Sequence, residues 1–81
     1  MSTEHIEVRL PDLGDVGDVK VVEWLVDIGQ TIAQDDDLVE VETEKTTFVV
    51  PSPADGRLAR IAVAAGGTAR TGDLLGELAA E

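Results

Sequence analysis

The chain has few of the side chains from which enzymes build reactive sites. Its 81 residues include no cysteine and no tyrosine, and only one histidine, one tryptophan and one phenylalanine. Without cysteine there is no disulfide, no thiolate nucleophile and no cysteine ligand for zinc. The single histidine, His5, lies near the start of the chain and leaves little room for a nucleophile–histidine pair. We therefore expect no catalysis by this chain itself and no metal site, and we expect any reactive group to come from elsewhere.

Positive charge and long apolar runs are also scarce. Acidic residues outnumber basic residues by 17 to 6, which gives a formal net charge of −11. This balance disfavours binding to a nucleic-acid backbone or to an anionic membrane. No apolar stretch is long enough to span a bilayer, and the first residues carry neither a basic stretch nor an apolar signal core. We expect a cytoplasmic location in a bacterium, or the mitochondrial matrix for a processed eukaryotic chain.

The apolar residues that are present recur with the two-residue period of β-strands. No convincing stripe of helical period accompanies them. Predicted strands cover residues 6–10, 19–26, 38–43, 47–50, 56–63 and 74–78. Turn residues separate them, with Gly29 as an expected positive-φ position and the aspartates at 35–37 as a solvated turn rather than a cation site. The pattern predicts one all-β domain over residues 1–81: seven or eight short strands forming a small sandwich or flattened barrel.

The sequence contains an internal repeat. Residues 18–41 align without a gap on residues 55–78, an offset of 37 positions. Seven positions are identical: Asp18/Asp55, Val26/Val63, Gly29/Gly66, Thr31/Thr68, Asp36/Asp73, Leu38/Leu75 and Glu40/Glu77. Neither copy is long enough to bury its apolar face alone, so we expect two similar half-sheets packed about a pseudo-twofold axis.

The repeat also predicts which residues of the strand at 19–26 are buried. Val22, Trp24 and Val26 align with apolar residues in the second copy. Residues 21, 23 and 25 align with residues 58, 60 and 62, and this alignment places Glu23 on Arg60, so both sets contain a charged residue. We therefore expect the first set to form the core. Phe48, in a strongly β-prone segment, is expected to be buried as well.

One lysine stands apart from the rest of the sequence. Residues 42–47 lie between two predicted strands and are expected to form a tight hairpin tip that carries Lys45. The only other lysine, Lys20, lies within a strand. A hairpin apex is unhindered and is held by rigid strands, which suits a lysine that another enzyme must reach and modify. On the turn alone, an ordinary solvated lysine remains the alternative interpretation.

Several runs of the sequence, taken together, resemble the lipoyl domains of dihydrolipoamide acyltransferases. These domains are the swinging-arm modules of 2-oxo acid dehydrogenase complexes. The matching runs are LPDLG at 10–14, VEWLV at 22–26 followed by Gly29, VEVETEK at 39–45, PSPADG at 51–56 and GDLL at 72–75. They cover about residues 6–79 in the family order and spacing. The resemblance implies a flattened barrel of two four-stranded antiparallel sheets with pseudo-twofold symmetry.

The resemblance also implies a cofactor and the residues around it. In the family, the lysine of an Asp-Lys-Ala tip carries lipoic acid in amide linkage, and by position that lysine is Lys45. Here Glu44 replaces the usual Asp and Thr46 the usual Ala, which keeps an acid before the lysine and a small residue after it. The loop after the first strand lies beside this hairpin in the family. Glu44, Thr46, Asp15 and Asp18 are therefore expected to contribute to recognition around the arm.

The resemblance implies partners as well. A lipoate-attaching enzyme would modify Lys45, and a thiamine-diphosphate-dependent decarboxylase would acylate the arm. An acyltransferase core would receive the acyl group, and dihydrolipoyl dehydrogenase would reoxidise the arm. A monomeric domain of a pyruvate-type complex is expected. A free-standing carrier and an unmodified interaction domain remain alternatives. Biotin is disfavoured because its signature places the lysine between two methionines, and the only methionine here is Met1.

Overall fold

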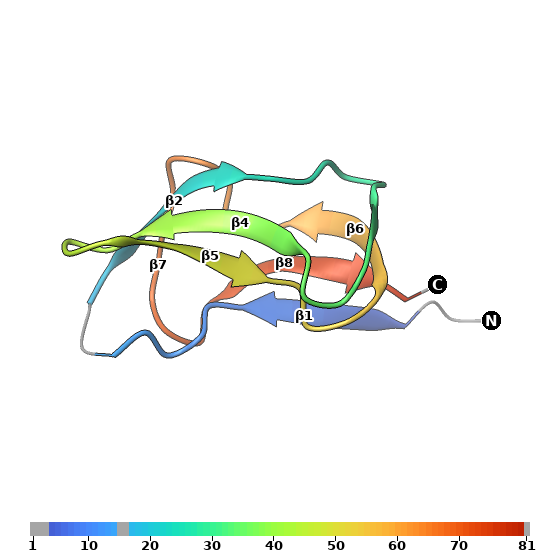
Figure 1. The fold of residues 1–81 in the computed structure, drawn as a ribbon, viewed down its shortest axis with the longest axis horizontal. Helices are drawn as coiled ribbons and strands as arrows, with labels where there is room; N and C mark the ends of the chain where they lie inside the picture. Colours follow the sequence, from blue (N-terminus) through green and yellow to red (C-terminus); the bar gives the residue numbers. More distant parts are fainter. Residues whose placement is uncertain (1–3, 15–16, 81) are drawn as a thin grey trace.

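In the part of the chain that the structure describes, eight β-strands form two four-stranded antiparallel sheets (Figure 1). The computed structural model describes residues 4–14 and 17–80. The strands are β1 (His5–Arg9), β2 (Val19–Trp24), β3 (Thr31–Ile32), β4 (Asp37–Glu42), β5 (Thr47–Pro51), β6 (Gly56–Ile61), β7 (Thr68–Ala69) and β8 (Leu74–Ala79). Sheet I has the order β1-β8-β6-β3, and sheet II has the order β5-β4-β2-β7. The all-β prediction of two four-stranded antiparallel sheets is confirmed. None of the described residues belongs to a helix that is long and apolar enough to cross a membrane.

The two copies of the repeat adopt the same structure and exchange hydrogen bonds. Strands β2, β3 and β4 of the first copy correspond to β6, β7 and β8 of the second, at the offset seen in the sequence. The Gly29 amide donates to the Leu58 carbonyl at 2.7 Å, and the Gly66 amide donates to the Val21 carbonyl at 2.8 Å. Both glycines have φ near +90° (91° and 93°), a conformation that glycine adopts without strain. Each copy therefore closes its turn onto the other copy, as a pseudo-twofold axis requires.

A small aliphatic core fills the space between the sheets. Its members come from both copies and from the two strands outside the repeat. They are Val8, Leu10, Val19, Val21, Val26, Ile32, Leu38, Val39, Val41, Val50, Leu58, Ala69, Leu75 and Leu78. Because these side chains are mostly β-branched or leucine, they suit the pleated surface of a sheet and pack without a polar group to satisfy.

The predicted core set of the strand at 19–26 is partly wrong, because β2 contains a bulge. Val21 is fully buried, whereas Val22 is 37% exposed. The pairing of β2 with β4 shifts between Val21 and Glu23, so the alternation of inward and outward side chains along β2 is displaced by one residue there. Beyond the bulge Val26 is buried, as predicted, and Trp24 is half-buried. β6 has the same irregularity at the repeat-equivalent position, between residues 58 and 60.

The prediction that Phe48 is buried is also wrong, since 36% of it is exposed. Phe48 lies opposite Val41, which is fully buried, and so shares the inner face of sheet II. β5 is an edge strand, however, so no neighbouring strand covers its other flank. The edge position of the strand explains why a large apolar residue is left partly in solvent.

The hairpin between β4 and β5 lies at one end of the molecule, and the outer ends of β1 and β8 lie at the other (Figure 1). His5 and Ala79, at those outer ends, are directly paired. The molecule measures 42 × 20 × 19 Å, with the hairpin and the paired strand ends separated along the longest dimension. The two ends are therefore available for different tasks.

We predict that truncating repeat-equivalent core leucines is far more damaging than truncating Phe48. Leu38→Ala and Leu75→Ala should each cost about 2–5 kcal/mol, because both side chains are fully buried. A small domain has only about 5 kcal/mol in total. Phe48→Ala should cost about 1 kcal/mol and keep a cooperative urea transition. An equal loss for Phe48→Ala would contradict the exposed position of this ring.

Candidate functional site

The hairpin tip consists of residues 43–46. β4 ends at Glu42 and β5 begins at Thr47, and these two residues pair directly. Beyond them the Thr43 amide donates to the Thr46 carbonyl at 2.8 Å. Glu44 and Lys45 are then the two residues at the apex, and the tip extends beyond the two sheets (Figure 1). The predicted hairpin is present, with Lys45 at its apex.

The hydroxyl group of Thr43 fixes the shape of this tip. Its oxygen accepts hydrogen bonds from the amides of Lys45, at 3.2 Å, and Thr46, at 3.1 Å. The same hydroxyl donates to the Thr46 carbonyl at 3.0 Å. One donor and two acceptor sites are the full capacity of a hydroxyl group. Since Thr43 is only 6% exposed, the loop is anchored from inside the hairpin.

This anchoring matters because the turn is not one of the types that suit a two-residue hairpin best. Those types require positive φ, and Asp35 is the one non-glycine residue with positive φ in the described part of the chain. Glu44 and Lys45 therefore have negative φ, which by itself tends to splay the flanking strands. The Thr43 hydroxyl bridges the turn and compensates for this tendency.

The Lys45 side chain is exposed. Within the described residues its ammonium group makes no ion pair and no hydrogen bond. Its neighbours Glu44 and Thr46 are exposed as well. Lys20, by contrast, lies in a central strand, opposite Glu42 on one side and Thr68 on the other. Both lysines are exposed, but Lys20 is flanked by two strands whereas Lys45 stands at the apex of the hairpin.

The sequence-predicted recognition loop connects β1 to β2 at the same end of the molecule as the hairpin (Figure 1). Asp18 accepts a hydrogen bond from the Arg70 guanidinium at 2.8 Å and forms an exposed ion pair with it. The hydrogen bond and charge of Asp18 raise the pKa of Arg70. The carboxylate of Asp18 thus holds the end of the loop against the turn before β8. Asp15 lies outside the described residues.

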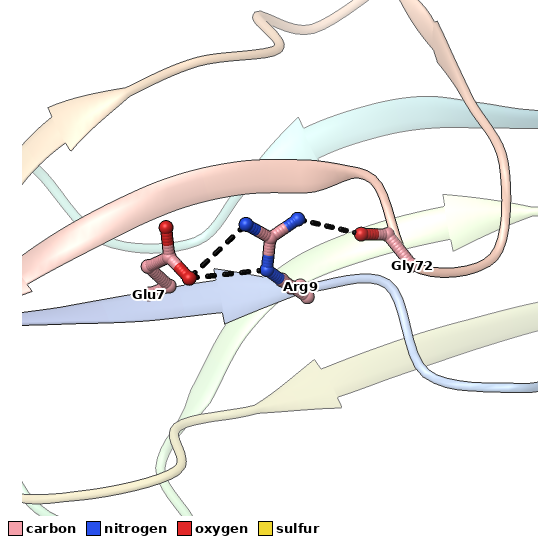
Figure 2. A network of polar contacts seen from close by, with 3 residues as sticks. All are labelled: Glu7, Arg9 and Gly72. Carbon is pink, nitrogen blue, oxygen red and sulfur yellow. Dashed lines mark hydrogen bonds and ion pairs between the residues drawn. The ribbon is translucent and has the colours of Figure 1, made fainter.

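A second residue that anchors this loop, Arg9, is absent from the residues singled out in the sequence. Figure 2 shows its guanidinium joining two segments. It donates to the Glu7 carboxylate at 3.1 and 3.2 Å and to the Gly72 carbonyl at 2.8 Å. The Leu10 amide, next along the chain, donates to the Asp73 carbonyl at 3.0 Å. The available signal was the spacing of Glu7 and Arg9, which places both on the outer face of one strand.

These features agree with comparisons to known proteins. A family model described as "Biotin-requiring enzyme", the biotin/lipoyl model, matches residues 6–78. The chain belongs to the biotin/lipoyl attachment family.

The curated relatives include acyltransferase components. The chain is 33% identical over 75 residues to the "Dihydrolipoyllysine-residue acetyltransferase component of pyruvate dehydrogenase complex" of Pseudomonas aeruginosa, covering 93% of this chain and 14% of that protein. It is 41% identical over 75 residues to the "Dihydrolipoyllysine-residue succinyltransferase component of 2-oxoglutarate dehydrogenase complex" of Bartonella vinsonii subsp. berkhoffii, covering 91% of this chain and 18% of that protein. The chain therefore spans less than a fifth of the length of these relatives.

Among the solved structures, one lipoyl domain is similar in both sequence and fold. The lipoyl domain of the 2-oxoglutarate dehydrogenase complex from Azotobacter vinelandii is 31% identical, with a TM-score of 0.73, and the match covers 94% of this chain and 96% of that one. The urea carboxylase of Kluyveromyces lactis reaches a TM-score of 0.79 at 17% identity, covering 96% of this chain and 6% of that one, which shows a shared fold alone. The chain is a biotin/lipoyl attachment domain similar to the lipoyl domains of 2-oxo acid dehydrogenase acyltransferases.

We predict that the Thr43 hydroxyl, rather than the size of the side chain, holds the tip. Thr43→Val keeps the volume but removes three hydrogen bonds, and it should cost about 1 kcal/mol of stability. The amides of Lys45 and Thr46 should then exchange with solvent markedly faster. Thr43→Ser should restore slow exchange. Equal exchange rates in the wild type and the valine variant would show that the backbone alone sets the turn.

Proposed function

We propose that this chain is a lipoyl carrier domain and that lipoic acid is attached to Nζ of Lys45. The observation that carries the proposal is the unpartnered ammonium group at the apex of an anchored hairpin. A lipoate-attaching enzyme would form an amide between Nζ and the lipoate carboxyl group. The tip fits this group because nothing in the described structure covers the apex, and both flanking residues are small or solvent-directed.

When attached, the lipoyl group supplies a dithiolane that can carry an acyl group and two electrons. The chain's own residues contribute position rather than catalysis. Thr43 fixes the hairpin, and β4 and β5 hold the tip away from the body of the sheets. The described part of the chain gathers no group of three or more histidine, cysteine or carboxylate side chains that would hold a metal ion.

The shape of the molecule supports a role as a tethered carrier. The hairpin between β4 and β5, which carries Lys45, lies at one end of the long axis, and the paired outer ends of β1 and β8 lie at the other (Figure 1). A linker joined to either strand end would leave the domain opposite the arm. Tethering of this kind raises the local concentration of a carried group at each partner enzyme. The proposed partners are a thiamine-diphosphate-dependent decarboxylase, an acyltransferase core and dihydrolipoyl dehydrogenase.

We propose pyruvate as the 2-oxo acid whose acyl group is carried. Acetyltransferase components of pyruvate dehydrogenase complexes from Pseudomonas aeruginosa and Staphylococcus aureus, the latter 39% identical, support this choice. The Bartonella succinyltransferase favours 2-oxoglutarate as the alternative. Acylation of the lipoylated domain by purified pyruvate and 2-oxoglutarate decarboxylases distinguishes them, since the cognate decarboxylase should give a kcat/KM that is higher by about tenfold or more.

We predict that Lys45 is the only lipoylated residue. Incubation with lipoate ligase, ATP and lipoate should add the mass of one lipoyl group, located by peptide mapping at Lys45. Lys45→Arg should abolish the addition, and Lys20→Arg should leave it unchanged, because Lys20 lies within a central strand. Modification of Lys20, or biotinylation by a biotin ligase in place of lipoylation, would refute the proposal.

We further predict that recognition by the decarboxylase can be lost while attachment is kept. Glu44→Ala, or Asp15→Asn with Asp18→Asn, should leave ligase turnover near normal. The same changes should slow acylation of the lipoylated domain several-fold, and less so at high salt, because surface charges act mainly on encounter.

The structure provides a control for the loop variant. Arg70→Gln breaks the same ion pair as Asp18→Asn but keeps both loop carboxylates. If Arg70→Gln slowed acylation as much as the double aspartate variant, the loop would act through its conformation and not through recognition by charge.

A further inference from the structure

The two copies of the repeat differ in charge at one structurally equivalent pair of positions. In the second copy Arg60 of β6 lies directly opposite Glu77 of β8. Their side chains form an ion pair at 2.9 Å. In the first copy the equivalent positions are Glu23 of β2 and Glu40 of β4, which are also directly opposite. Sheet I thus carries opposite charges where sheet II carries two carboxylates.

Two glutamates directly opposite each other across a strand pair repel, and such pairs destabilise a sheet. In the described part of sheet II neither carboxylate forms an ion pair or a hydrogen bond, and Lys20 lies opposite Glu42 rather than opposite either of them. Glu40 is also half-buried, so its charge is less well solvated than that of a fully exposed residue. A cation between these carboxylates would pair with them, as Arg60 pairs with Glu77 in sheet I.

Apolar side chains flank the two glutamates. Val49 of β5 lies opposite Glu40 on the side away from β2, and Val22 occupies the bulge next to Glu23. Both valines are exposed, at 44% and 37%. Val22, Glu23, Glu40 and Val49 therefore form one row across the outer side of β2, β4 and β5, which we call the docking face. The centre of a protein interface is typically apolar, and arginine is enriched there.

The docking face lies on the same hairpin as the proposed attachment site. Glu40 is five residues before Lys45, and Val49 is four residues after it. The row between them and the tip contains Lys20 opposite Glu42, two residues of opposite charge. A protein that encloses the arm and grips the hairpin would meet the unbalanced row next.

We propose that the docking face binds an arginine of the decarboxylase that acylates the arm, and that this guanidinium takes the place between Glu23 and Glu40 that Arg60 takes beside Glu77. The inference rests on the proposed lipoyl carrier function. Arginine fits because its planar guanidinium can donate to two carboxylates at once and loses little hydration on burial. Apolar side chains of the same partner surface pack on Val22 and Val49.

The internal repeat supplies the test. Glu23→Arg builds into sheet II the arginine–glutamate pair that sheet I already has. The introduced guanidinium should pair with the Glu40 carboxylate and so exclude the partner's arginine. Acylation of the lipoylated Glu23→Arg domain by the decarboxylase should fall about tenfold or more in kcat/KM at low salt. The thermal midpoint should rise by a few degrees, since a repulsive pair becomes attractive.

Two controls separate this effect from charge and from folding. Asp27→Arg changes the net charge equally at an exposed turn between β2 and β3, and it should alter neither the acylation rate nor the thermal midpoint beyond about twofold and about one degree. Val49→Thr should slow acylation several-fold, whereas the same change at exposed Ile28 should not. Acylation of Glu23→Arg within twofold of the Asp27→Arg rate, roughly the error of such comparisons, would overturn the proposal.

Ligase turnover distinguishes a failure of this inference from a failure of the proposed function. Wild type and Glu23→Arg should be lipoylated at similar rates, because attachment depends on the tip. If the wild type is lipoylated and acylated but Glu23→Arg is acylated equally well, the docking face alone is wrong. If Glu23→Arg loses ligation and acylation equally, the face serves the hairpin geometry and the docking proposal is overturned. If the wild type accepts no lipoate, the carrier function itself is refuted.

Discussion

Neither half of this molecule can bury its apolar face without the other, and this mutual dependence shapes the rest of the structure. Each copy contributes three strands and a glycine turn, and the turn of each copy donates its hydrogen bond to a strand of the other. Leu58 and Val21, whose carbonyls accept those bonds, are themselves fully buried. Backbone pairing and core packing are therefore made by the same residues. In a chain of 81 residues this overlap matters, because a small domain buries little surface and cannot lose either its backbone pairing or its core packing and stay folded.

The features proposed for function lie where the two halves are not equivalent. β1 lies beside β8 in sheet I as β5 lies beside β4 in sheet II, but β4 and β5 are consecutive strands joined by the tip at 43–46, whereas β8 and β1 are not consecutive. The outer faces differ in the same way. In sheet I, arginines pair with Glu7 and Glu77, whereas in sheet II Glu23 and Glu40 face each other without a cation. Symmetry thus accounts for the stable scaffold, and departures from symmetry mark the surface that a partner would read.

The proposed site is rigid and exposed at once, and both properties have a local cause. The rigid part comes from Thr43, which is buried and uses its hydroxyl fully on the backbone of the tip. The exposed part comes from Lys45, which the two-residue apex leaves without neighbours in the described structure. A carrier has to present one amine at a fixed position to several enzymes, and a short anchored hairpin does this without a pocket.

Much of this arrangement follows from the sequence alone. Two-residue periodicity located the six longer strands, the repeat predicted paired half-sheets, and the spacing of turn residues placed Lys45 at an exposed apex. β3 and β7 were missed because two residues are too few to show a period. The exposure of Val22 and Phe48 was also beyond the sequence, since a bulge and an edge position depend on which strands become neighbours. The pairing of Glu23 with Glu40 and of Asp18 with Arg70 joins residues 17 and 52 positions apart. Local patterns fix the faces and turns of single strands, whereas cross-strand register is decided only when all eight strands pair, and that register determines which charges meet.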